Sequence, residues 1–393
     1  MTFTNLDKFQ HGINAQSNLE NIITYCKKQG YIAAYIKNFR VGKAEYVNKG
    51  QFYAPFIIEF DDKEKWAIFS TTSMRTDRVK GQQWDAVNLK EIDSSIKKAY
   101  LIYSDGVFIK DKREFERQNH KYLTGYEYSA IDGIISQEAF YNLIEAKALS
   151  NMEMGKLKDK QGRSFENRVA AILSSCENLE KWKTNSFTLV GQHYAIFETV
   201  IEKFGLNPET TLSIIATTDK NIIGRLPSGG NPKTDILVTV ECDDGLYYFT
   251  ISCKRTAEES VGVHQYTADA FTDVLNAEDT ELRRLLNEFQ KYGNLRDFGE
   301  ANCTKLTEIL QPYQEKLAMW VLGGTFGGGN PQKQWATHLL TYDGNSKLNI
   351  HTVQEYIQLL HEAGVKGNFG TFFSWTYPSK CRGKSIKLKC KIL

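Results

Sequence analysis

An aspartate and a lysine in the second half of the chain have the types and spacing of a phosphodiester-cleaving site. Asp235 ends the run PKTD, and Lys254 ends the run SCK on the next apolar segment. Phosphodiester hydrolysis needs a hard cation, held by carboxylate and carbonyl oxygens, and a cationic group that positions water and neutralises developing charge. In this interpretation Asp235 is a metal ligand and Lys254 is the cationic group.

The strand that carries Lys254 determines which neighbours share the site. Side chains two residues apart on a strand point to the same side, so Ser252 and Lys254 should face one cleft while Cys253 faces the core. The Cys253 backbone carbonyl could still serve as a metal ligand. An ordinary pair of surface strands also carries Asp and Lys, so this pattern alone leaves the catalytic and the structural interpretation open.

These residues must be positioned by a β-hairpin and a helix. Residues 233–255 read as two strand-like runs joined at Asp243, Asp244 and Gly245, an acceptable hairpin connection. Residues 163–182 have helical spacing and should pack against the sheet. The apolar face of this predicted helix consists of Phe165, Val169, Ile172 and Leu173.

Further elements follow along the second half of the chain. Residues 279–293 and 305–322 predict helices, the second interrupted near Pro312, and residues 338–353 return to strand character around Asp343 and Gly344. The glycine-rich run 323–331 lacks the Lys-Ser/Thr ending of a nucleotide-binding loop, so a flexible loop is expected there.

The first part of the chain predicts a separate, smaller α/β domain over residues 1–150. Ser17 and Glu20 have capping-box spacing and Gly30 supplies a stop signal, which predicts a helix between them. Three strand-like runs and a helix after Ser136 complete the domain. The strand-like runs cover residues 52–60, 65–73 and 98–109. A polar stretch, residues 151–163, leads into a second domain over residues 159–393.

Basic residues near Trp84 leave the role of this first domain open. Arg75, Arg78 and Lys80 follow a predicted strand, with Trp84 close behind. They could contact DNA phosphates, or they could form an ordinary surface beside a packed tryptophan. The hypothesis that the domain adds DNA contacts or stabilises docking remains to be tested.

Composition excludes several protein classes. The chain has 393 residues, of which 41% are apolar, as in globular proteins. No stretch approaches the roughly 18 apolar residues of a membrane span, and the first residues lack a signal-peptide pattern, so a cytoplasmic protein is expected. The seven cysteines are scattered without a CxxC pair, which predicts free thiols.

The formal net charge of +2 conceals a basic C-terminal segment. Its cations have no acidic residue among them, which favours a polyanionic partner, although a solvated charged end would look the same. The cations of this segment are Lys380, Arg382, Lys384, Lys387, Lys389 and Lys391.

Several dispersed runs resemble those of the MspI-type type II restriction endonucleases. The resemblance extends from about residue 160 to the C-terminus and is carried, in order, by RSFENRV, WKTNSF, GRLPSGGNPKTD, TISCKR, KLTEILQPYQEKLAMW and FGTFFSWTYPSKCRGKSIKLK. It implies a PD-(D/E)xK nuclease core with a mixed central sheet flanked by helices. It also implies a magnesium cofactor, cleavage of double-stranded DNA at CCGG by a monomer or transient dimer, and a companion DNA methyltransferase in the host.

The resemblance assigns roles within the cleavage site. Asp235 matches the metal-binding aspartate and Lys254 the catalytic lysine. Ser252 departs from the pattern, because it stands where an acid is usual and where MspI has asparagine, and a hydroxyl is a poorer magnesium ligand than a carboxylate. Metal binding would then rest more on Asp235, the Cys253 carbonyl and water. Glu166 matches a family glutamate and is either a supporting carboxylate or an exposed helical residue.

The same resemblance points to residues that read the DNA sequence. Thr376 and Lys389 match groove-facing positions, and a lysine that contacts guanine O6 and N7 suits a GC-rich site. Gly262 stands where MspI has serine, so any contact there must come from the backbone. Trp375 either stacks on a base or packs in the core, and Lys233 is a further candidate DNA contact.

Two rival functions remain open at this point. The first is a DNA-binding protein that keeps the nuclease fold but has lost turnover, which Ser252 makes plausible. The second is a modification-dependent or repair nuclease whose N-terminal domain reads a methylated or damaged base. Magnesium titration distinguishes the binding protein from an active nuclease. Comparison of methylated with unmethylated substrates distinguishes the modification-dependent nuclease from a restriction endonuclease.

Overall fold

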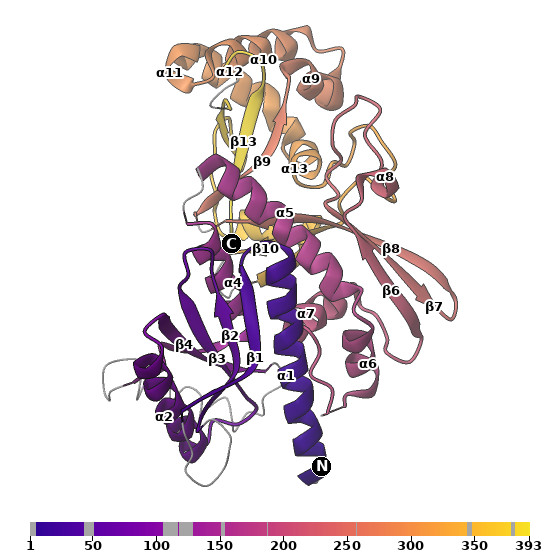
Figure 1. Cartoon of the computed structure of the whole chain (residues 1–393). Helices are drawn as coiled ribbons and strands as arrows, with labels where there is room; N and C mark the ends of the chain where they lie inside the picture. Colours follow the sequence, from indigo (N-terminus) through magenta and orange to yellow (C-terminus); the bar gives the residue numbers. More distant parts are fainter. Residues whose placement is uncertain are drawn as a thin grey trace. The chain divides into compact units, whose positions relative to one another are not determined.

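The computed structural model describes residues 5–42, 51–104, 117, 129–150, 154–186, 188–256, 258–343, 348–378 and 382–393. The chain divides into two compact units (Figure 1). The first comprises Met1–Lys158 and Ser175–Glu198, and the second Asp159–Ser174 and Thr199–Leu393. Among the described residues, no helix combines the length and apolar character that a membrane crossing requires.

The first unit is built on a mixed five-stranded sheet. Its strand order is β1-β2-β3-β4-β5, with antiparallel pairs from β1 to β3 and parallel pairs from β3 to β5. The strands are β1 (Ala34–Val41), β2 (Phe52–Glu59), β3 (Lys65–Thr71), β4 (Ile96–Tyr103) and β5 (Gly133–Ser136). The three predicted strand runs are confirmed within the described residues; residues 105–109 lie outside them.

Helices cover both faces of this sheet because side chains alternate along its strands. Phe56 and Ile58 of β2 pack with helices α1 (Asn5–Lys28) and α4 (Gln137–Ala148). Ile57, between them, packs with α2 (Thr76–Ile92) on the opposite face. The predicted helix after Ser136 is confirmed, with Ser136 as its N-cap.

The predicted start of the first helix at Ser17 is wrong. Helix α1 begins at Asn5, so Ser17 and Glu20 lie in its interior. Buried residues before Ser17, His11 and Ala15, extend the packed face in the N-terminal direction. Tertiary packing of that face outweighs a capping-box spacing that occurs by chance.

The first unit includes a segment, Ser175–Glu198, that is separated in sequence from the rest of the unit. It consists of α6 (Cys176–Thr184) and the first residues of α7 (Tyr194–Phe204). Its backbone carbonyls at Thr188 and Gly191 accept hydrogen bonds from Asn14 and Asn18 of α1. The predicted division near residues 150–159 placed residues 175–198 with the second domain, whereas these contacts group them with the first unit.

The second unit contains a mixed five-stranded sheet of order β11-β10-β8-β7-β6. Strands β7 and β8 form the predicted antiparallel hairpin, and β8 pairs with β10 in parallel. The strands are β6 (Thr211–Thr217), β7 (Ile236–Cys242), β8 (Gly245–Arg255), β10 (His338–Tyr342) and β11 (Leu348–Thr352). A mixed α/β architecture is therefore confirmed, and Gly344 lies outside the described residues.

Helix α5 (Met154–Leu173) packs its apolar face against this sheet. The Phe165 ring stacks on Tyr342 of β10 with centroids 5.1 Å apart, and the predicted apolar face is buried. The prediction of one helix over residues 163–182 is wrong, however. Helix α5 ends at Leu173. Ser174 then forms hydrogen bonds with the Ala216 backbone of β6, and Ser175 caps the separate helix α6.

A three-stranded antiparallel sheet of order β12-β13-β9 lies beside a helical layer in the same unit (Figure 1). Its strands are β9 (Ser260–Tyr266), β12 (Ser374–Thr376) and β13 (Ile386–Lys391). Their apolar sides join a core with the predicted helices. Besides parts of α5 and α7, the described helices of this second unit are α8 (Lys220–Ile223), α9 (Ala268–Asn276), α10 (Thr280–Tyr292), α11 (Leu295–Phe298), α12 (Glu300–Leu310), α13 (Gln314–Gly323) and α14 (Val353–Glu362).

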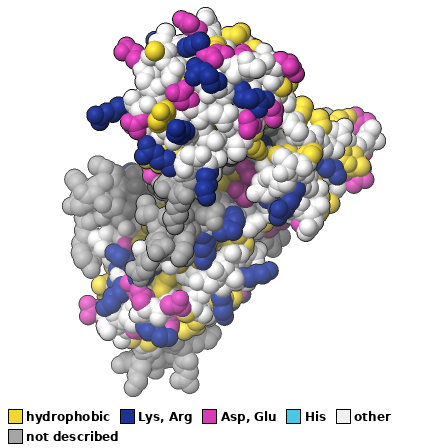
Figure 2. Space-filling model, turned by 90° about the horizontal axis from the view of Figure 1, so that it is seen from above, with side chains coloured by type: hydrophobic (Ala, Val, Ile, Leu, Met, Phe, Trp, Pro, Cys, Tyr) yellow, Lys and Arg dark blue, Asp and Glu magenta, His cyan; other side chains and the backbone are white. Residues whose placement is uncertain are grey.

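Pro312 lies in a 3-10 turn, Gln311–Tyr313, between α12 and α13, so the predicted interruption is confirmed. The described cysteines are free thiols as expected, and Cys381 lies outside the described residues. On the face seen in Figure 2, basic and acidic side chains are interspersed.

Candidate active site

Asp235 is held at the start of β7 by the backbone of the neighbouring strand. Its amide donates to the Ile251 carbonyl at 2.9 Å, and its Oδ2 atom accepts from the Cys253 amide at 2.8 Å. Two main-chain hydrogen bonds therefore orient the carboxylate against β8. Its side chain is 21% exposed, so it remains accessible from solvent.

Lys254 brings its ammonium to the same place. The Nζ atom lies 3.4 Å from Asp235 Oδ2 and 2.8 Å from the Ser252 hydroxyl. Ser252 Oγ in turn lies 3.3 Å from Asp235 Oδ2. The predicted alternation along β8 therefore places the side chains of Ser252 and Lys254 on the side of Asp235.

Cys253 offers its carbonyl rather than its thiol to this group. The carbonyl oxygen accepts from Lys254 Nζ at 2.9 Å, which shows that it faces the site. Burial, followed by the negative charges of Asp235 and Glu166, raises the pKa of the thiol well above its ordinary value. The thiol therefore stays protonated, and a protonated thiol is not a metal ligand.

Glu166 of α5 adds a second carboxylate. Burial first, and then the negative charge of Asp235, raise the pKa of Glu166 to about 7. The nearby charges of Lys220 and Lys254 act in the opposite direction. The Glu166 carboxyl is therefore an electrostatic neighbour of Asp235, which excludes the interpretation that it is a solvated surface residue.

This donor set fits a hard divalent cation that takes only part of its ligands from side chains. Among the described residues there is no cluster of three or more His, Cys, Asp and Glu side chains suited to a metal. Two carboxylates and the Cys253 carbonyl are oxygen donors of the kind that Mg²⁺ prefers, with waters completing the shell. A bound cation would favour the charged form of Glu166, which burial and the Asp235 charge disfavour.

Sequence reasoning missed Lys220. It begins the four-residue helix α8, which Asp219 caps, and its charge acts on both Glu166 and Cys253. A helix of one turn has no apolar periodicity, so the only available signal was the capping residue Asp219.

The predicted groove-facing residues lie on the three-stranded sheet. Lys389 of β13 pairs with Ser374 of β12 and with Gly262 of β9, and Thr376 pairs with Lys387. Leu388 between the two lysines is fully buried, so both lysines lie on the face opposite the core. The structure thus brings Gly262, Thr376 and Lys389 together on one face.

Lys387 is a further basic residue on that face that sequence reasoning did not single out. Its Cε atom would lie 2.9 Å from a β-carbon added to Gly262. The absence of a side chain at residue 262 therefore leaves room for the Lys387 stem to pass, which is a close-approach role for this glycine.

Trp375 packs in the core rather than on the groove-facing surface. Its side chain is 4% exposed, it contacts Phe271 and Phe369, and its Nε1 atom donates to Thr371. The prediction that it contacts DNA is therefore wrong. The alternative prediction, core packing, is correct because the apolar side of β12 faces the helical layer.

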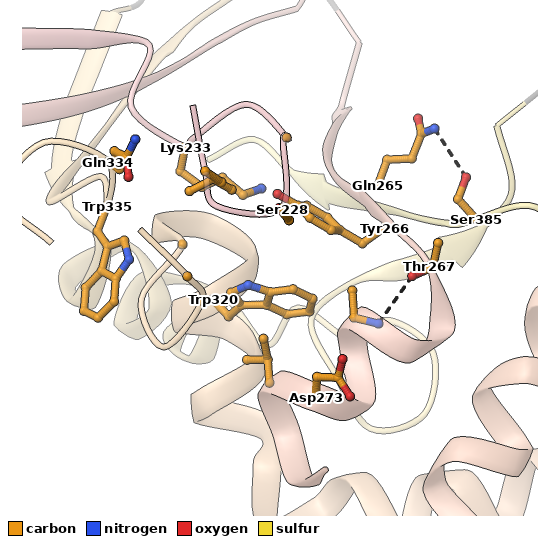
Figure 3. A pocket seen from close by; sticks show the side chains of 17 residues that line it. Ser228, Lys233, Gln265, Tyr266, Thr267, Asp273, Trp320, Gln334, Trp335 and Ser385 are labelled. Atoms are coloured by element: carbon orange, nitrogen blue, oxygen red, sulfur yellow. Dashed lines mark hydrogen bonds between the residues drawn. The ribbon is translucent and has the colours of Figure 1, made fainter. Parts of the chain in front are cut away.

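Lys233 is half-buried, and its ammonium donates to the Val263 carbonyl of β9 at 2.5 Å. Burial, reinforced by the positive charge of Lys254, lowers its pKa well below the ordinary value. Lys233 also lines a pocket beside α13 (Figure 3). Its position is therefore inside the second unit rather than on an open basic surface.

Comparisons with known proteins identify the family of this chain. Residues 141–390 match the family Restriction endonuclease MspI. The type II restriction enzyme BsuFI of Bacillus subtilis is 27% identical over 350 residues, 86% of each chain. The type II restriction enzyme MspI of Moraxella sp. is 23% identical over 250 residues, 61% of this chain and 93% of that enzyme.

A solved structure shares the fold of a large part of the chain. The crystal structure of MspI in complex with its cognate DNA matches with a TM-score of 0.53 and 21% identity, over 61% of this chain and 92% of that chain. The match to BsuFI is longer than the span matched by the family, so it extends into the N-terminal unit. The chain therefore belongs to the MspI family of type II restriction endonucleases, which are site-specific deoxyribonucleases.

Proposed function

We propose that this enzyme cleaves double-stranded DNA at CCGG by magnesium-dependent hydrolysis, with Asp235 and Lys254 at the centre of a PD-(D/E)xK core. The observation that carries the proposal is the convergence of Asp235, Ser252 and Lys254 within 3.4 Å of one another. An anchored carboxylate beside an ammonium is the arrangement that this chemistry requires.

Each residue has a separate role in the proposed reaction. Asp235 and the Cys253 carbonyl, supported by Glu166, would hold Mg²⁺, which when bound supplies Lewis-acid neutralisation of the phosphate. Lys254 positions the attacking water and stabilises the charge that develops on the phosphate oxygens. Water attacks phosphorus directly, the bond from phosphorus to the 3′ oxygen breaks, and the products carry a 3′-hydroxyl and a 5′-phosphate.

Ser252 makes a different contribution from the acid that is usual at its position. It is fully buried, and its hydroxyl accepts a hydrogen bond from Lys254. A neutral hydroxyl orients the ammonium without adding a third negative charge beside Asp235 and Glu166. Binding of Mg²⁺ would consequently depend on the carboxylates of Asp235 and Glu166, which assigns Glu166 a larger share of metal binding.

The groove-facing strands support the proposed recognition of CCGG. Lys389 lies in register between Ser374 and Gly262, with Lys387 on the same face. A lysine suits guanine O6 and N7 in the major groove, and Thr376 supplies a hydroxyl that can donate or accept. Contact at Gly262 would come from its backbone, because no side chain is available.

Partners follow from this proposed activity. An enzyme that cuts CCGG endangers the DNA of its host, so a companion DNA methyltransferase that protects those sites is expected. The N-terminal unit, which has a counterpart in BsuFI, would add DNA contacts or stabilise docking. Cleavage by a monomer that nicks twice and cleavage by a transient dimer both fit one site per chain.

A duplex substitution series tests the proposal. Binding and cleavage are measured separately on a duplex with one CCGG site and on duplexes in which each base pair is exchanged in turn, with Mg²⁺ from 0 to 10 mM. Cleavage of CCGG alone, only with Mg²⁺, is expected. Tight binding without cleavage at any Mg²⁺ concentration would instead support the turnover-deficient rival.

A further inference from the structure

A pocket of about 550 Å³ lies between β9, α9 and α13 of the second unit, beside the proposed catalytic residues (Figure 3). Lys233 lines it, and Lys233 precedes Asp235 by two residues. The volume is within the range of roughly 300–1,000 Å³ of ligand pockets. The cleavage mechanism proposed above makes no use of this pocket.

The glycine-rich segment 323–331 forms one side of the pocket. A β-carbon on Gly324 would lie 2.9 Å from Lys233 Cγ, and one on Gly327 would lie 2.8 Å from Trp320 Nε1. The backbone therefore approaches both side chains more closely than any other residue type allows. The segment is a loop, as predicted, and its glycines pack closely against residues that line the pocket.

Two aromatic side chains form adjoining walls of the pocket. Trp320 is fixed by His264 and Phe271, at centroid distances of 4.1 and 5.0 Å. Tyr266 lies 5.5 Å from Trp320 with a ring angle of 49°. In the view of Figure 3 the Trp320 ring crosses the pocket below Tyr266 and Lys233. Trp320 is only 4% exposed, so a flat ligand would stack on the half-buried Tyr266 ring and touch Trp320 with its edge.

Polar groups occur at one end of this aromatic surface. The hydroxyls of Ser228 and Tyr266 lie 3.6 and 3.8 Å from the position of a β-carbon on Gly230. The Lys233 amine donates to the Val263 carbonyl and keeps at least one further N–H donor. The pocket therefore offers flat apolar walls with hydrogen-bonding groups along an edge, which is the chemistry of a nucleobase.

We propose that this pocket receives an unstacked nucleobase of the bound DNA strand near the cleavage point. The inference rests on the proposed function, because it takes DNA near Asp235 as the source of the base. Base stacking on an aromatic side chain offsets the cost of removing a base from the duplex. One lysine among apolar walls suits a base better than a phosphate, which would need several cationic groups.

Fluorescent base analogues test the proposal directly. Duplexes with one CCGG site carry 2-aminopurine at each purine, or pyrrolo-cytosine at each cytosine, of the site and its two flanking pairs. They are mixed with the protein in EDTA, and anisotropy verifies binding. One position should gain several-fold fluorescence from unstacking, or lose it by quenching on Trp320, while the other positions keep the signal of the duplex.

A pocket-filling variant links that signal to the pocket. Gly230→Leu should be tolerated, because a β-carbon there meets only ordinary contacts and its backbone is not left-handed. Its side chain would project between Ser228 and Tyr266. It should abolish the fluorescence change and weaken binding of CCGG DNA on the order of 10-fold, as expected for one lost stacked base.

Gly12→Leu is the matched control, since Gly12 lies in α1 with open space around its β-carbon position. It should keep the affinity and the fluorescence change of the wild type. Thermal melting of both variants separates misfolding from pocket filling.

Three outcomes distinguish the inference from the proposed function. Unchanged fluorescence at every position in a tight complex would overturn the inference, whether or not the wild type cleaves CCGG in Mg²⁺. Binding of free dCMP or dGMP can be measured by quenching of tryptophan fluorescence. If these nucleotides bind while the DNA analogues show no change, the pocket does not take its base from the DNA strand, which would overturn the inference. Failure of cleavage together with an unstacked base would overturn the proposed function alone.

Discussion

The Nζ atom of Lys254 lies 2.8 Å from the Oγ atom of Ser252, two residues earlier on the same strand. Because Ser252 is fully buried, its hydroxyl has one fixed environment in which to accept this hydrogen bond. The lysine is thereby oriented by a neutral group, while Asp235 supplies the nearest negative charge, at 3.4 Å. In the proposed active site, this pair stands where the PD-(D/E)xK pattern has an acid and a lysine.

Replacing Ser252 with alanine should slow cleavage without weakening DNA binding. The variant loses the hydroxyl that orients Lys254, so kcat is expected to fall about 10- to 100-fold, less than for loss of a transition-state donor itself. Single-turnover cleavage and anisotropy measure the two effects. Thr341→Val is the matched control, since its buried hydroxyl on the neighbouring β10 has no hydrogen-bond partner in the described structure. Equal rates for Ser252→Ala and the wild type would contradict the orienting role.

Glu166→Gln should stabilise the protein in EDTA at high pH. Burial and the Asp235 charge raise the pKa of Glu166 from 4.5 to about 7. Between these values the folded protein retains a proton that the unfolded chain has released, so wild-type stability falls as pH rises through this window. The variant lacks this loss and should be more stable by on the order of 1–2 kcal/mol at pH 8, with little difference at pH 4.

Magnesium should reverse the difference in stability between the wild type and Glu166→Gln. A cation bound by the two carboxylates neutralises the repulsion, so Mg²⁺ at pH 8 should raise the melting temperature of the wild type more than that of Glu166→Gln. Melting curves with EDTA and with Mg²⁺ at both pH values provide the test. A stabilisation by Mg²⁺ of the same size in both proteins would show that Glu166 does not take part in metal binding.

Gly324→Ala should destabilise the second unit by about 2–4 kcal/mol, because it combines a positive φ with a clash. Its φ is +80°, and the added carbon would lie 2.9 Å from Lys233 Cγ. Gly364→Ala is the control, because that residue has a φ of +60° but open space, so only about 1 kcal/mol is expected. Urea unfolding measures both, and equal losses would exclude the close approach to Lys233.

Neutralising two cations of α2 tests the proposed role of the N-terminal unit. If Arg78 and Lys80 contact phosphates, the double variant to glutamine should bind DNA more weakly and lower the slope of log K against log salt by about 2. Both side chains belong to exposed residues of α2. Lys63→Gln is the control, with a side chain that is 79% exposed in the turn between β2 and β3. An unchanged slope would exclude phosphate contacts by these two residues.

Alternation along the strands made the centre of the site predictable. A strand-like run begins after Asp235, a second one carries Lys254, and a short polar turn joins them. Those local features determine that Ser252 and Lys254 share a side and that the Cys253 side chain is turned inward. The role of each residue remains a proposal that came from the family resemblance rather than from this pattern.

Features formed by distant parts of the chain could not be predicted in this way. The pocket joins Lys233, Tyr266 and Trp320 with a glycine-rich segment, and no local pattern connects them. Trp375 was a candidate DNA contact because it belongs to a run that resembles the family, but strand alternation directs it to the core. Lys220 influences Glu166 only through the fold.

The most direct test of the central claim is digestion of a plasmid with known CCGG positions, with and without Mg²⁺, followed by sequencing of the ends. Wild type and Lys254→Ala are compared, with Lys366→Ala as a control at an exposed lysine of the same unit. The wild type and the control should make discrete magnesium-dependent cuts at CCGG that leave 5′-phosphates at the ends. Lys254→Ala should make no cuts. Intact plasmid with the wild type despite measurable binding, or undiminished cutting by Lys254→Ala, would contradict the proposed active site.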